Sequence, residues 1–341
     1  MCLSNLLYLQ NNNGDKYRFI MKKLFAYCVV VAIIFASCAR SEKVSDGQFG
    51  PYTVDTIIEN VYHIQDCNDD NPSGETFDED GNKTHFNNCS DMYLLVGSEK
   101  ALLIDLSNPI DWADNASESL RDIVGSRIGE RDLQITFTHN HGDHTGMLPA
   151  FVEDPEVEFL LPRVDFEPLV DRFSAARYSF YDEGYEFDLG GMKISTLAVP
   201  GHTAGSMVFF LDGKDILFGG DAIGSGHGVW IFSLDLFKAY ADGIEHLVEY
   251  IENPENGIDA DALRMYGGHY WQKDWFPELG DDVFGIQYIR DMQQLVIGIS
   301  DGTAYSEPSN LGNALMDTYF RNGQAIVAWN ASQAEEYRNA R

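Results

Sequence analysis

A cluster of histidines and aspartates is the feature of this chain that is best suited to chemistry. Three histidines and one aspartate occur within Thr138–Thr145, and three further His or Asp residues each follow an apolar run later in the chain. The seven candidate ligands are His139, His141, Asp143, His144, His202, Asp221 and His269. Imidazole nitrogens and carboxylate oxygens without thiolates suit zinc or a similar first-row metal. Seven ligands are too many for one tetrahedral ion, and two neighbouring ions can hold a hydroxide between them for hydrolysis.

The spacing within the cluster predicts how it could serve two ions. A short turn after a strand can direct alternate side chains at a common point, so His139 and His141 can share one metal while Asp143 and His144 face a second. The alternative is a polar loop in which the histidines are coincidental. The chain has nine histidines, and three of them fall within six residues here. This clustering favours a metal site.

Apolar runs predict the strands that would position these ligands. The expected strands are Val54–Gln65, Met92–Val96, Ala101–Asp105, Leu133–Phe137, Lys193–Val199, Asp215–Phe218 and Leu263–Tyr266. Helices are expected at Asp114–Val124, Leu236–Ile251 and Asp281–Ile299, and a hairpin at Tyr319–Val327 around Asn322-Gly323. Strand, turn and ligand recur in this order, so that rigid strand ends hold the loops that carry the chemistry. Glycines beside His202, Asp221 and His269 would let the backbone bend tightly around the ions.

Four segments resemble, in the same order, the signature of the metallo-β-lactamase superfamily. They are Thr138–Gly146, Gly201–Ser206, Gly220-Asp221 and Gly268-His269. The resemblance extends over about Val54–His269. It implies an α/β fold, the four-layer αββα sandwich, with the metals at one edge of the two sheets. To this fold the chain would add an inserted hairpin and a C-terminal extension made of a helix and a hairpin.

The resemblance also implies a role for each ligand. The first metal would be bound by three imidazoles, those of His139, His141 and His202. The second would be bound by Asp143, His144 and His269. Asp221 would bridge both ions, and Asp105, at the end of its strand, would support the ligand loop from below. The implied cofactor is a pair of zinc ions, with iron or manganese as alternatives.

The subclass departs from the antibiotic-degrading branch. Asp221 stands where many true β-lactamases of this superfamily have Cys or Ser. A bridging aspartate is similar instead to the glyoxalase II, lactonase and phosphodiesterase branches. The loop after His202 has Ala204 where Pro is frequent, which is a minor change.

These features predict an exported hydrolase that uses a metal-bridging hydroxide to cleave an ester, a lactone or a related acyl bond. The positive charge of two ions would lower the pKa of bound water, and Asp143 could orient the hydroxide and later carry a proton. The alternatives are a phosphodiesterase, a β-lactamase, or an oxidoreductase with one iron that is similar to persulfide dioxygenases.

The surroundings of Asp221 give weaker clues to the substrate. Lys238 is the only basic residue between Asp215 and Leu263, which weighs against β-lactams and glutathione thioesters. His227 could face the cleft as a proton donor or substrate contact, although a loop histidine without such a role is the alternative. The formal net charge of −31 weighs against nucleic acid as a partner. The acidic segment between Cys67 and Cys89 would favour small neutral or cationic substrates.

The N-terminal segment resembles a bacterial lipoprotein signal. After a better start at Met21, two lysines precede the apolar run Leu24–Phe35, and Ala36-Ser37 lead into Cys38. Cys38 would carry the lipid and anchor the protein in the periplasm at a bacterial membrane, with the outer membrane preferred. An uncleaved anchor or an ordinary secretory signal are the alternatives.

Two cysteines remain in the body of the chain, Cys67 and Cys89. An exported compartment permits a disulfide between them. They bracket an acidic insertion with an expected turn at Asp80–Asn82, which would be either a substrate lid or an inert surface hairpin. The predicted organisation is a signal region at 1–37, a linker at 38–53, a catalytic domain at 54–275 and an extension at 276–341 packed on the same domain.

Overall fold

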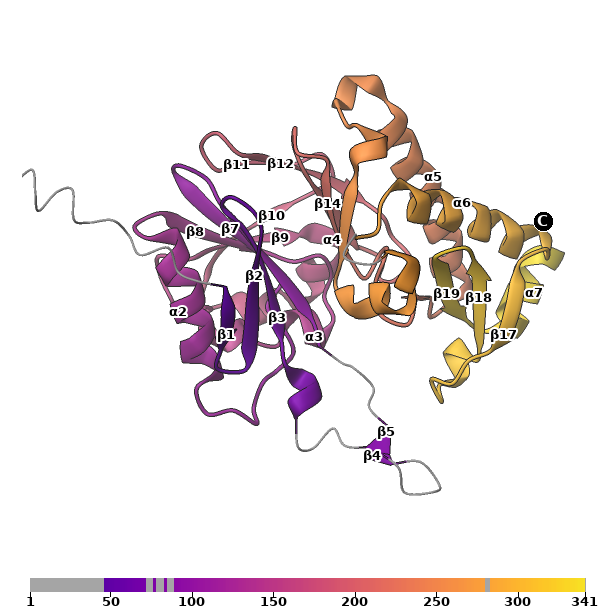
Figure 1. Ribbon diagram of the computed structural model, residues 1–341, viewed down its shortest axis with the longest axis horizontal. Coiled ribbons are helices and arrows are strands. Elements are labelled where there is room, and N and C mark those ends of the chain that lie inside the picture. The colour runs from indigo at the N-terminus through magenta and orange to yellow at the C-terminus, as the bar shows by residue number, and fades with distance from the viewer. Residues whose placement is uncertain (1–45, 72–75, 78–82, 85–88, 280–282, 341) are drawn as a thin grey trace, which may run out of the picture. The chain divides into compact units, whose positions relative to one another are not determined.

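The computed structural model describes residues 46–71, 76–77, 83–84, 89–279 and 283–340 (Figure 1). The predicted signal region, the lipidation site Cys38 and the expected turn at Asp80–Asn82 lie outside the described residues. None of the helices in the described part of the chain has both the length and the apolar character needed to cross a membrane.

The first sheet has eight strands, and its central strands are buried on both faces. Their order is β1 (Gly47–Phe49), β2 (Tyr52–Ile58), β3 (Val61–Asp66), β6 (Asp91–Val96), β7 (Lys100–Ile104), β8 (Asp132–Thr136), β9 (Glu158–Pro162) and β10 (Arg177–Tyr181). Pairing is antiparallel from β1 to β7 and parallel from β7 to β10. Helix α2 (Ala116–Ile128) makes the crossover from β7 to β8, as a parallel pair requires.

The second sheet has five strands and a helix of its own. Its order is β11 (Glu186–Asp188), β12 (Lys193–Ala198), β13 (Met207–Leu211), β14 (Ile216–Gly220) and β16 (Arg264–Gly267). Helix α5 (Leu234–Glu252) connects β14 to the parallel strand β16. It begins at a Ser233 cap, whose hydroxyl accepts a hydrogen bond from the Leu236 N–H.

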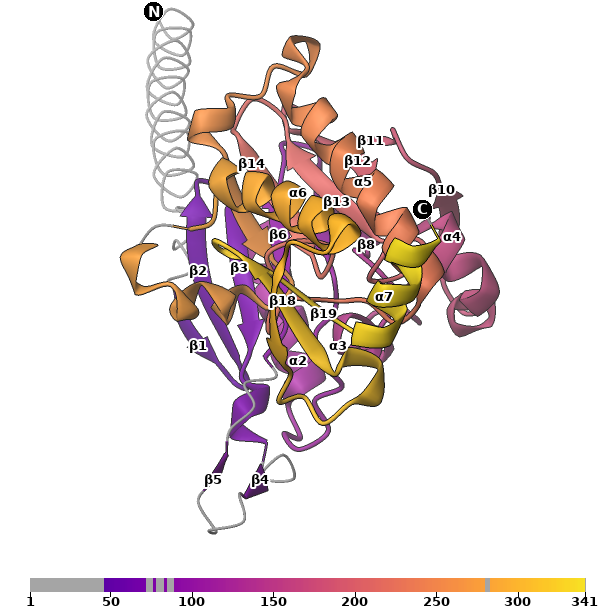
Figure 2. The same ribbon diagram turned by 90° about the vertical axis from the view of Figure 1, so that its right-hand side faces the viewer.

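Three apolar clusters account for the layers. Side chains of both sheets, such as Leu102 and Phe218, meet in one cluster between them. The other face of the first sheet packs on α2. The other face of the second sheet packs on α5 and on α6 (Ile286–Asp301), which lie in front of β13 and β14 in Figure 2. This arrangement is the αββα sandwich that the sequence predicts.

A third sheet joins the C-terminal segment to the body. Strands β17 (Tyr305–Pro308), β18 (Thr318–Asn322) and β19 (Ala325–Trp329) are antiparallel, and β15 (Val229–Trp230) pairs in parallel with β19. The predicted hairpin around Asn322-Gly323 is confirmed as β18–β19, with Gly323 at φ +53°. Helix α7 (Ala331–Asn339) follows, and both α6 and α7 contribute to the core around α5.

Two expected elements differ in their bounds. The single strand expected over Val54–Gln65 is a hairpin, because Asn60 adopts φ +66° and turns the chain between β2 and β3. The last long helix begins at Ile286, because the Phe284 carbonyl just before it accepts a hydrogen bond from the Met265 N–H in an isolated bridge. Its expected start, Asp281, lies outside the described residues.

Short elements complete the described chain. In the insertion, β4 (Thr76–Phe77) and β5 (Lys83–Thr84) pair antiparallel. The short α-helices are α3 (Gly142–Thr145) and α4 (Arg163–Phe166). The 3₁₀ turns are Asn68–Asp70, Leu148–Ala150, Glu167–Phe173, Pro254–Asn256, Ala260–Ala262, Tyr270–Trp275, Pro277–Leu279 and Ala314–Met316.

Candidate metal centre

The seven predicted ligands converge although they come from both sheets. His139 and His141 lie between β8 and α3, and Asp143 and His144 lie on α3. The other three follow the ends of strands in the second sheet: His202 after β12, Asp221 after β14 and His269 after β16. The strand ends therefore bring residues that are far apart in sequence to one edge of the sandwich.

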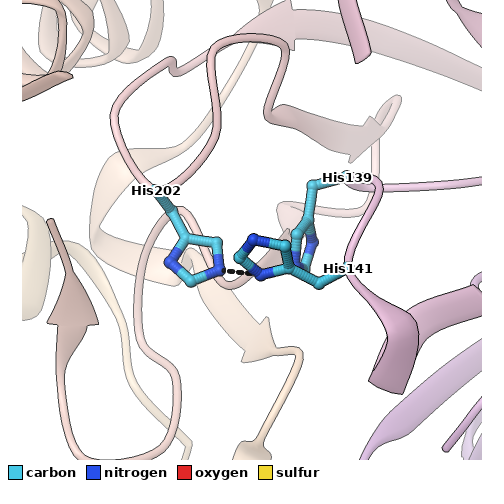
Figure 3. Close-up of side chains that lie close together, drawn as sticks. All are labelled: His139, His141 and His202. Atoms are coloured by element: carbon cyan, nitrogen blue, oxygen red, sulfur yellow. Dashed lines mark hydrogen bonds between the residues drawn. The ribbon is translucent and has the colours of Figure 1, made fainter. Parts of the chain in front are cut away.

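The converging side chains form two groups. In the first, the ligand atoms of His139, His141 and His202 lie within 4.8 Å of one another (Figure 3). The second group contains Asp143, His144, Asp221 and His269, within the same limit.

Asp221 belongs to the second group and also faces the first. Its Oδ2 is 3.5 Å from Nε2 of His202 in the first group and 3.5 Å from Nε2 of His269 in the second. Its Oδ1 is 3.3 Å from Nε2 of His144. One carboxylate therefore faces both groups, which is the position that a bridging ligand needs.

Hydrogen bonds fix the ring orientation of two histidines through one threonine and one aspartate. The Thr138 hydroxyl donates to Asp105 Oδ2 at 2.7 Å, so it must accept the proton of His139 Nδ1 at 3.0 Å. His144 Nδ1 donates to the same carboxylate at 3.0 Å. In both rings Nε2 is left buried without a hydrogen-bond partner. Such inward, unsatisfied nitrogens fit a metal ion.

Two more ligands are oriented by backbone carbonyls. His202 Nδ1 donates to the Trp230 carbonyl at 3.1 Å, and His269 Nδ1 donates to the Cys89 carbonyl at 2.7 Å. His202 Nε2 then lies 2.8 Å from His141 Nδ1, the pair joined in Figure 3. Nitrogen atoms that meet at this distance also fit a shared cation.

Asp105 lies below the ligand loop and is almost completely buried. Besides the two side-chain contacts, it accepts the Thr138 N–H at 2.7 Å. Its φ of +66° is unusual for a residue with a side chain, and it directs the carboxylate under the loop. Burial raises the pKa of Asp105, although its hydrogen bonds with His144 and Thr138 oppose this change.

The charges of the two groups differ. Burial lowers the pKa of His139 and His141, and lowers that of His202 to about 4. Burial also disfavours the charged forms of His144 and His269, but Asp221 and other carboxylates outweigh it and raise the pKa of both rings well above the usual value.

The carboxylates change in the opposite direction. Burial alone would raise the pKa of Asp143 and Asp221, but the neighbouring imidazoles outweigh it and lower both values. The site therefore holds ionised carboxylates, whose charge divalent cations could balance.

The position before His269 has no room for a side chain, so glycine is required there. A Cβ on Gly268 would lie 2.4 Å from Asp221 Oδ1 and 2.7 Å from His144 Cε1. Any side chain at this position would therefore displace ligands of the second group.

Sequence reasoning missed two residues that hold ligands in place. The Ser225 hydroxyl donates to Asp221 Oδ1 at 2.7 Å and accepts the His269 N–H at 2.8 Å. The Asp165 carboxylate accepts from the Asn140 N–H, the Thr203 hydroxyl and the Gly205 N–H, at 3.2, 2.7 and 2.8 Å. Asp165 therefore joins the two histidine loops, one from each sheet. The only signal for Ser225 was its place between glycines shortly after Asp221.

The remaining histidines have separate positions. His63 Nε2 lies 2.5 Å from Asp91 Oδ1, and the other oxygen of Asp91 accepts the Tyr270 N–H, which fixes the loop after His269. His246 pairs with the exposed Glu183. His85 lies outside the described residues.

A cavity of about 400 Å³ opens from the two groups, and both Asp143 and His227 line it. Burial is the main cause that lowers the pKa of His227 to about 4, and the positive charges of the neighbouring His269 and Arg321 add to it. The ring is then neutral near pH 7 and suits a hydrogen-bond contact better than donation from a charged imidazolium.

The insertion adjoins the site through its last residue. Cys89 is buried, and its carbonyl holds His269, while Cys67 is half-buried at the other end. Most of the residues between them lie outside the described part of the chain, so the lid stays a prediction. The disulfide between Cys67 and Cys89 also stays a prediction.

Comparisons with known proteins agree with the fold. The family model of the metallo-beta-lactamase superfamily matches residues 90–258. A solved metallo-beta-lactamase from Pontibacter korlensis superposes with a TM-score of 0.50 at 17% identity, covering 72% of this chain and 99% of that one.

Curated relatives match over about half of the chain or less. The Beta-lactamase-like protein 2 homolog of Caenorhabditis elegans is 28% identical, over 52% of this chain and 54% of its own. An atrochrysone carboxyl ACP thioesterase of Aspergillus terreus is 27% identical, over 53% of each chain. A hydroxyacylglutathione hydrolase of Halorhodospira halophila is 35% identical, over 27% of this chain and 33% of its own. The chain spans about half the length of the first two relatives. From the fold, the ordered ligand segments and these matches, the chain belongs to the metallo-beta-lactamase superfamily.

Proposed function

We propose that the protein is a metal-dependent hydrolase that binds two zinc ions and cleaves an ester, a lactone or a related acyl bond. The observation that carries the proposal is the position of Asp221 between two complete ligand groups. A site for one iron, as in the oxidoreductase alternative, would not need the second group of four residues.

Two divalent cations bound there would polarise a substrate carbonyl and lower the pKa of a water molecule. Asp143 is the residue that would orient this nucleophile. Its Oδ2 is 3.2 Å from His269 Nε2, and its side chain is 30% exposed toward the cavity. It would accept the proton of the attacking water and return it to the leaving group. Neutral His227 would donate a hydrogen bond to the substrate.

The choice of an acyl bond rests on charge and on the relatives. No lysine or arginine is found among the described residues that line the cavity, so a substrate carboxylate would lack a counter-charge there. This disfavours β-lactams and glutathione thioesters. A phosphodiester remains the second choice. The name of the Aspergillus terreus relative, a thioesterase, describes acyl cleavage.

Elemental analysis and a hydrolysis screen test the proposal together. We expect about two zinc ions per purified chain and turnover of a lactone or an aryl ester. Bis-aryl phosphate and a chromogenic cephalosporin are the competing substrates. One iron per chain, or turnover of the cephalosporin alone, would contradict the proposal.

Replacement of Asp143 by alanine tests the assigned mechanism. The Asp143→Ala variant should lose about 100-fold or more in kcat on the best substrate, since it removes the group that positions the nucleophile. The exposed Asp171→Ala, on the turn after α4, is the matched control. If Asp143→Ala turns over substrate at the rate of the control, the role assigned to Asp143 is wrong.

We also propose that the protein is exported and anchored by a lipid on Cys38. The support is the order of positive charge, apolar run and small residues before this cysteine. Wild-type protein expressed in a diderm bacterium should incorporate labelled palmitate and fractionate with membranes, and Cys38→Ala should do neither. Labelling of the variant at the wild-type level would disprove lipidation at this residue.

A further inference from the structure

The cavity beside the metal centre has an apolar wall that comes largely from the C-terminal sheet. Trp230 lies on β15 at the edge of this sheet, Phe232 follows it, and Leu311 lies in the connection between β17 and β18. All three are half-buried. They pack on an apolar cluster of the sheet: Met316, Tyr319, Ile326 and Ala328. One face of each side chain is thus fixed by the sheet, and the cavity lies against the rest.

Ring contacts connect this wall to two metal ligands and to His227. The Phe232 ring lies 5.8 Å from both His141 and His202, measured between ring centroids. The Trp271 ring, two residues beyond His269, meets His227 edge to face at 4.9 Å. Apolar surface therefore begins directly at the ligands, so a group attached to the scissile carbonyl would contact it.

The wall carries no charge that could match a charged substrate. Among the described residues that line the cavity, the carboxylates are Asp143 and Asp221, which face the ligand groups, and no lysine or arginine is present. Arg321, whose charge reaches His227, is paired with Glu307 at 2.6 Å. A carboxylate held against this wall, away from the metal ligands, would be desolvated without a partner, which is costly. An aromatic or alkyl group would instead bury apolar surface against the rings.

From this geometry we propose that the cavity binds the uncharged aromatic or alkyl group of an acyl substrate, and that Leu311 on the C-terminal extension helps to select it. The inference rests on the proposed hydrolase function and adds the substrate class to it. The selecting wall includes Leu311, which lies outside the segment 90–258 that matches the family model. The specificity of this chain would therefore be set partly by its own extension.

Three methyl esters test the inference. Methyl phenylacetate carries an uncharged aromatic group, methyl acetate lacks that group, and methyl 4-carboxyphenylacetate adds a charge to it. We expect kcat/KM for methyl phenylacetate to exceed that of each of the other two by about tenfold or more, as hydrophobic pockets discriminate on this scale. Similar values for all three esters would overturn the inference and leave the hydrolase intact.

Leu311→Lys is the decisive variant, and Leu315→Lys is its matched control. Leu315 lies in the same connection but is 46% exposed and outside the cavity. Leu311→Lys should lower kcat/KM for methyl phenylacetate by about tenfold and raise it for the carboxylated ester. Leu315→Lys should change neither, and both variants should keep the wild-type zinc content.

A binding measurement separates this inference from the proposed function. Calorimetric titration with phenylacetamide, an uncharged analogue, should give weaker binding for Leu311→Lys than for Leu315→Lys. If phenylacetamide binds in this way but no ester is hydrolysed, the proposed function fails and the pocket stands. If Leu311→Lys binds phenylacetamide like its control, the pocket assignment is wrong.

Discussion

At the scale of single residues, the protonation of the ligand rings depends on Asp105. Its two oxygens receive three donors, from the Thr138 backbone, the Thr138 hydroxyl and His144. Because all three protons point at the carboxylate, Nε2 of both His139 and His144 is turned toward the site. One buried aspartate thus sets the state of a ring in each ligand group.

Asp105→Asn should therefore weaken metal binding without removing any ligand. An amide NH₂ would face donors and favour the tautomer of His144 that places a proton on Nε2. We expect zinc affinity to fall by about 10- to 100-fold, measured by competition with a chelator. The exposed Asp111→Asn provides the control. Equal affinities for the two variants would show that Asp105 does not govern the rings.

The residues that sequence could and could not predict differ in a physical way. The ligands and Asp105 stand in short, ordered segments, each beside a strand end. Ser225 and Asp165 are single polar residues, and their partners belong to loops that only the folded chain brings together. The spacing of residues along the sequence therefore cannot predict these contacts.

At the scale of elements, strand register bears on the predicted disulfide. Gln65 on β3 is paired with Asp91 on β6, and the Asp66 N–H donates to the Ser90 carbonyl. Continued by one more pair, this register places Cys67 opposite Cys89. Directly opposed residues of antiparallel strands come close enough for a disulfide.

The exported protein should therefore contain this disulfide. Alkylation before and after reduction, followed by mass spectrometry, should protect both cysteines only in the unreduced sample. The Cys67→Ser/Cys89→Ser double variant should lose about 2–4 kcal/mol of unfolding free energy relative to the oxidised protein. Full alkylation of the unreduced, exported protein would disprove the pairing.

The long, regular elements could be predicted, whereas short or non-local strands could not. Apolar periodicity located α2, α5 and the strands β6, β7, β8, β12, β14 and β16 within a few residues of their bounds. It gave no strand for β9 or β13, although both are buried and lie inside their sheets. It missed the break at Asn60, because one residue with positive φ leaves the alternation unchanged. It also missed β15, a two-residue strand that exists only because β19 lies beside it.

At the scale of the whole molecule, the metal centre ties the two sheets together. One histidine loop extends from the first sheet, and His202, Asp221 and His269 extend from the second. Only the folded chain brings both sets of ligands together, so the ions would bind to the folded state and not to the unfolded one. Their binding would therefore raise the free energy of unfolding.

Removal of zinc should therefore lower the unfolding temperature. If the Kd is one-thousandth of the free zinc concentration, binding adds about 4 kcal/mol to the free energy of unfolding. For a domain of this size, that raises the unfolding temperature by roughly 10 °C. Calorimetry with a chelator should show the decrease, and added zinc should reverse it. Asp221→Ala should respond much less to either treatment. An unfolding temperature that is the same with and without zinc would contradict a centre that joins the sheets.

The contact between β15 and the first ligand group has an evolutionary consequence. His202 is held by the main-chain carbonyl of position 230, while the indole at that position belongs to the cavity wall. Any residue that preserves the β15–β19 pairing can supply the same carbonyl. Substitutions at position 230 could therefore change which substrates bind without disturbing the orientation of His202. Positions 230 and 311 are suitable choices for a randomised library.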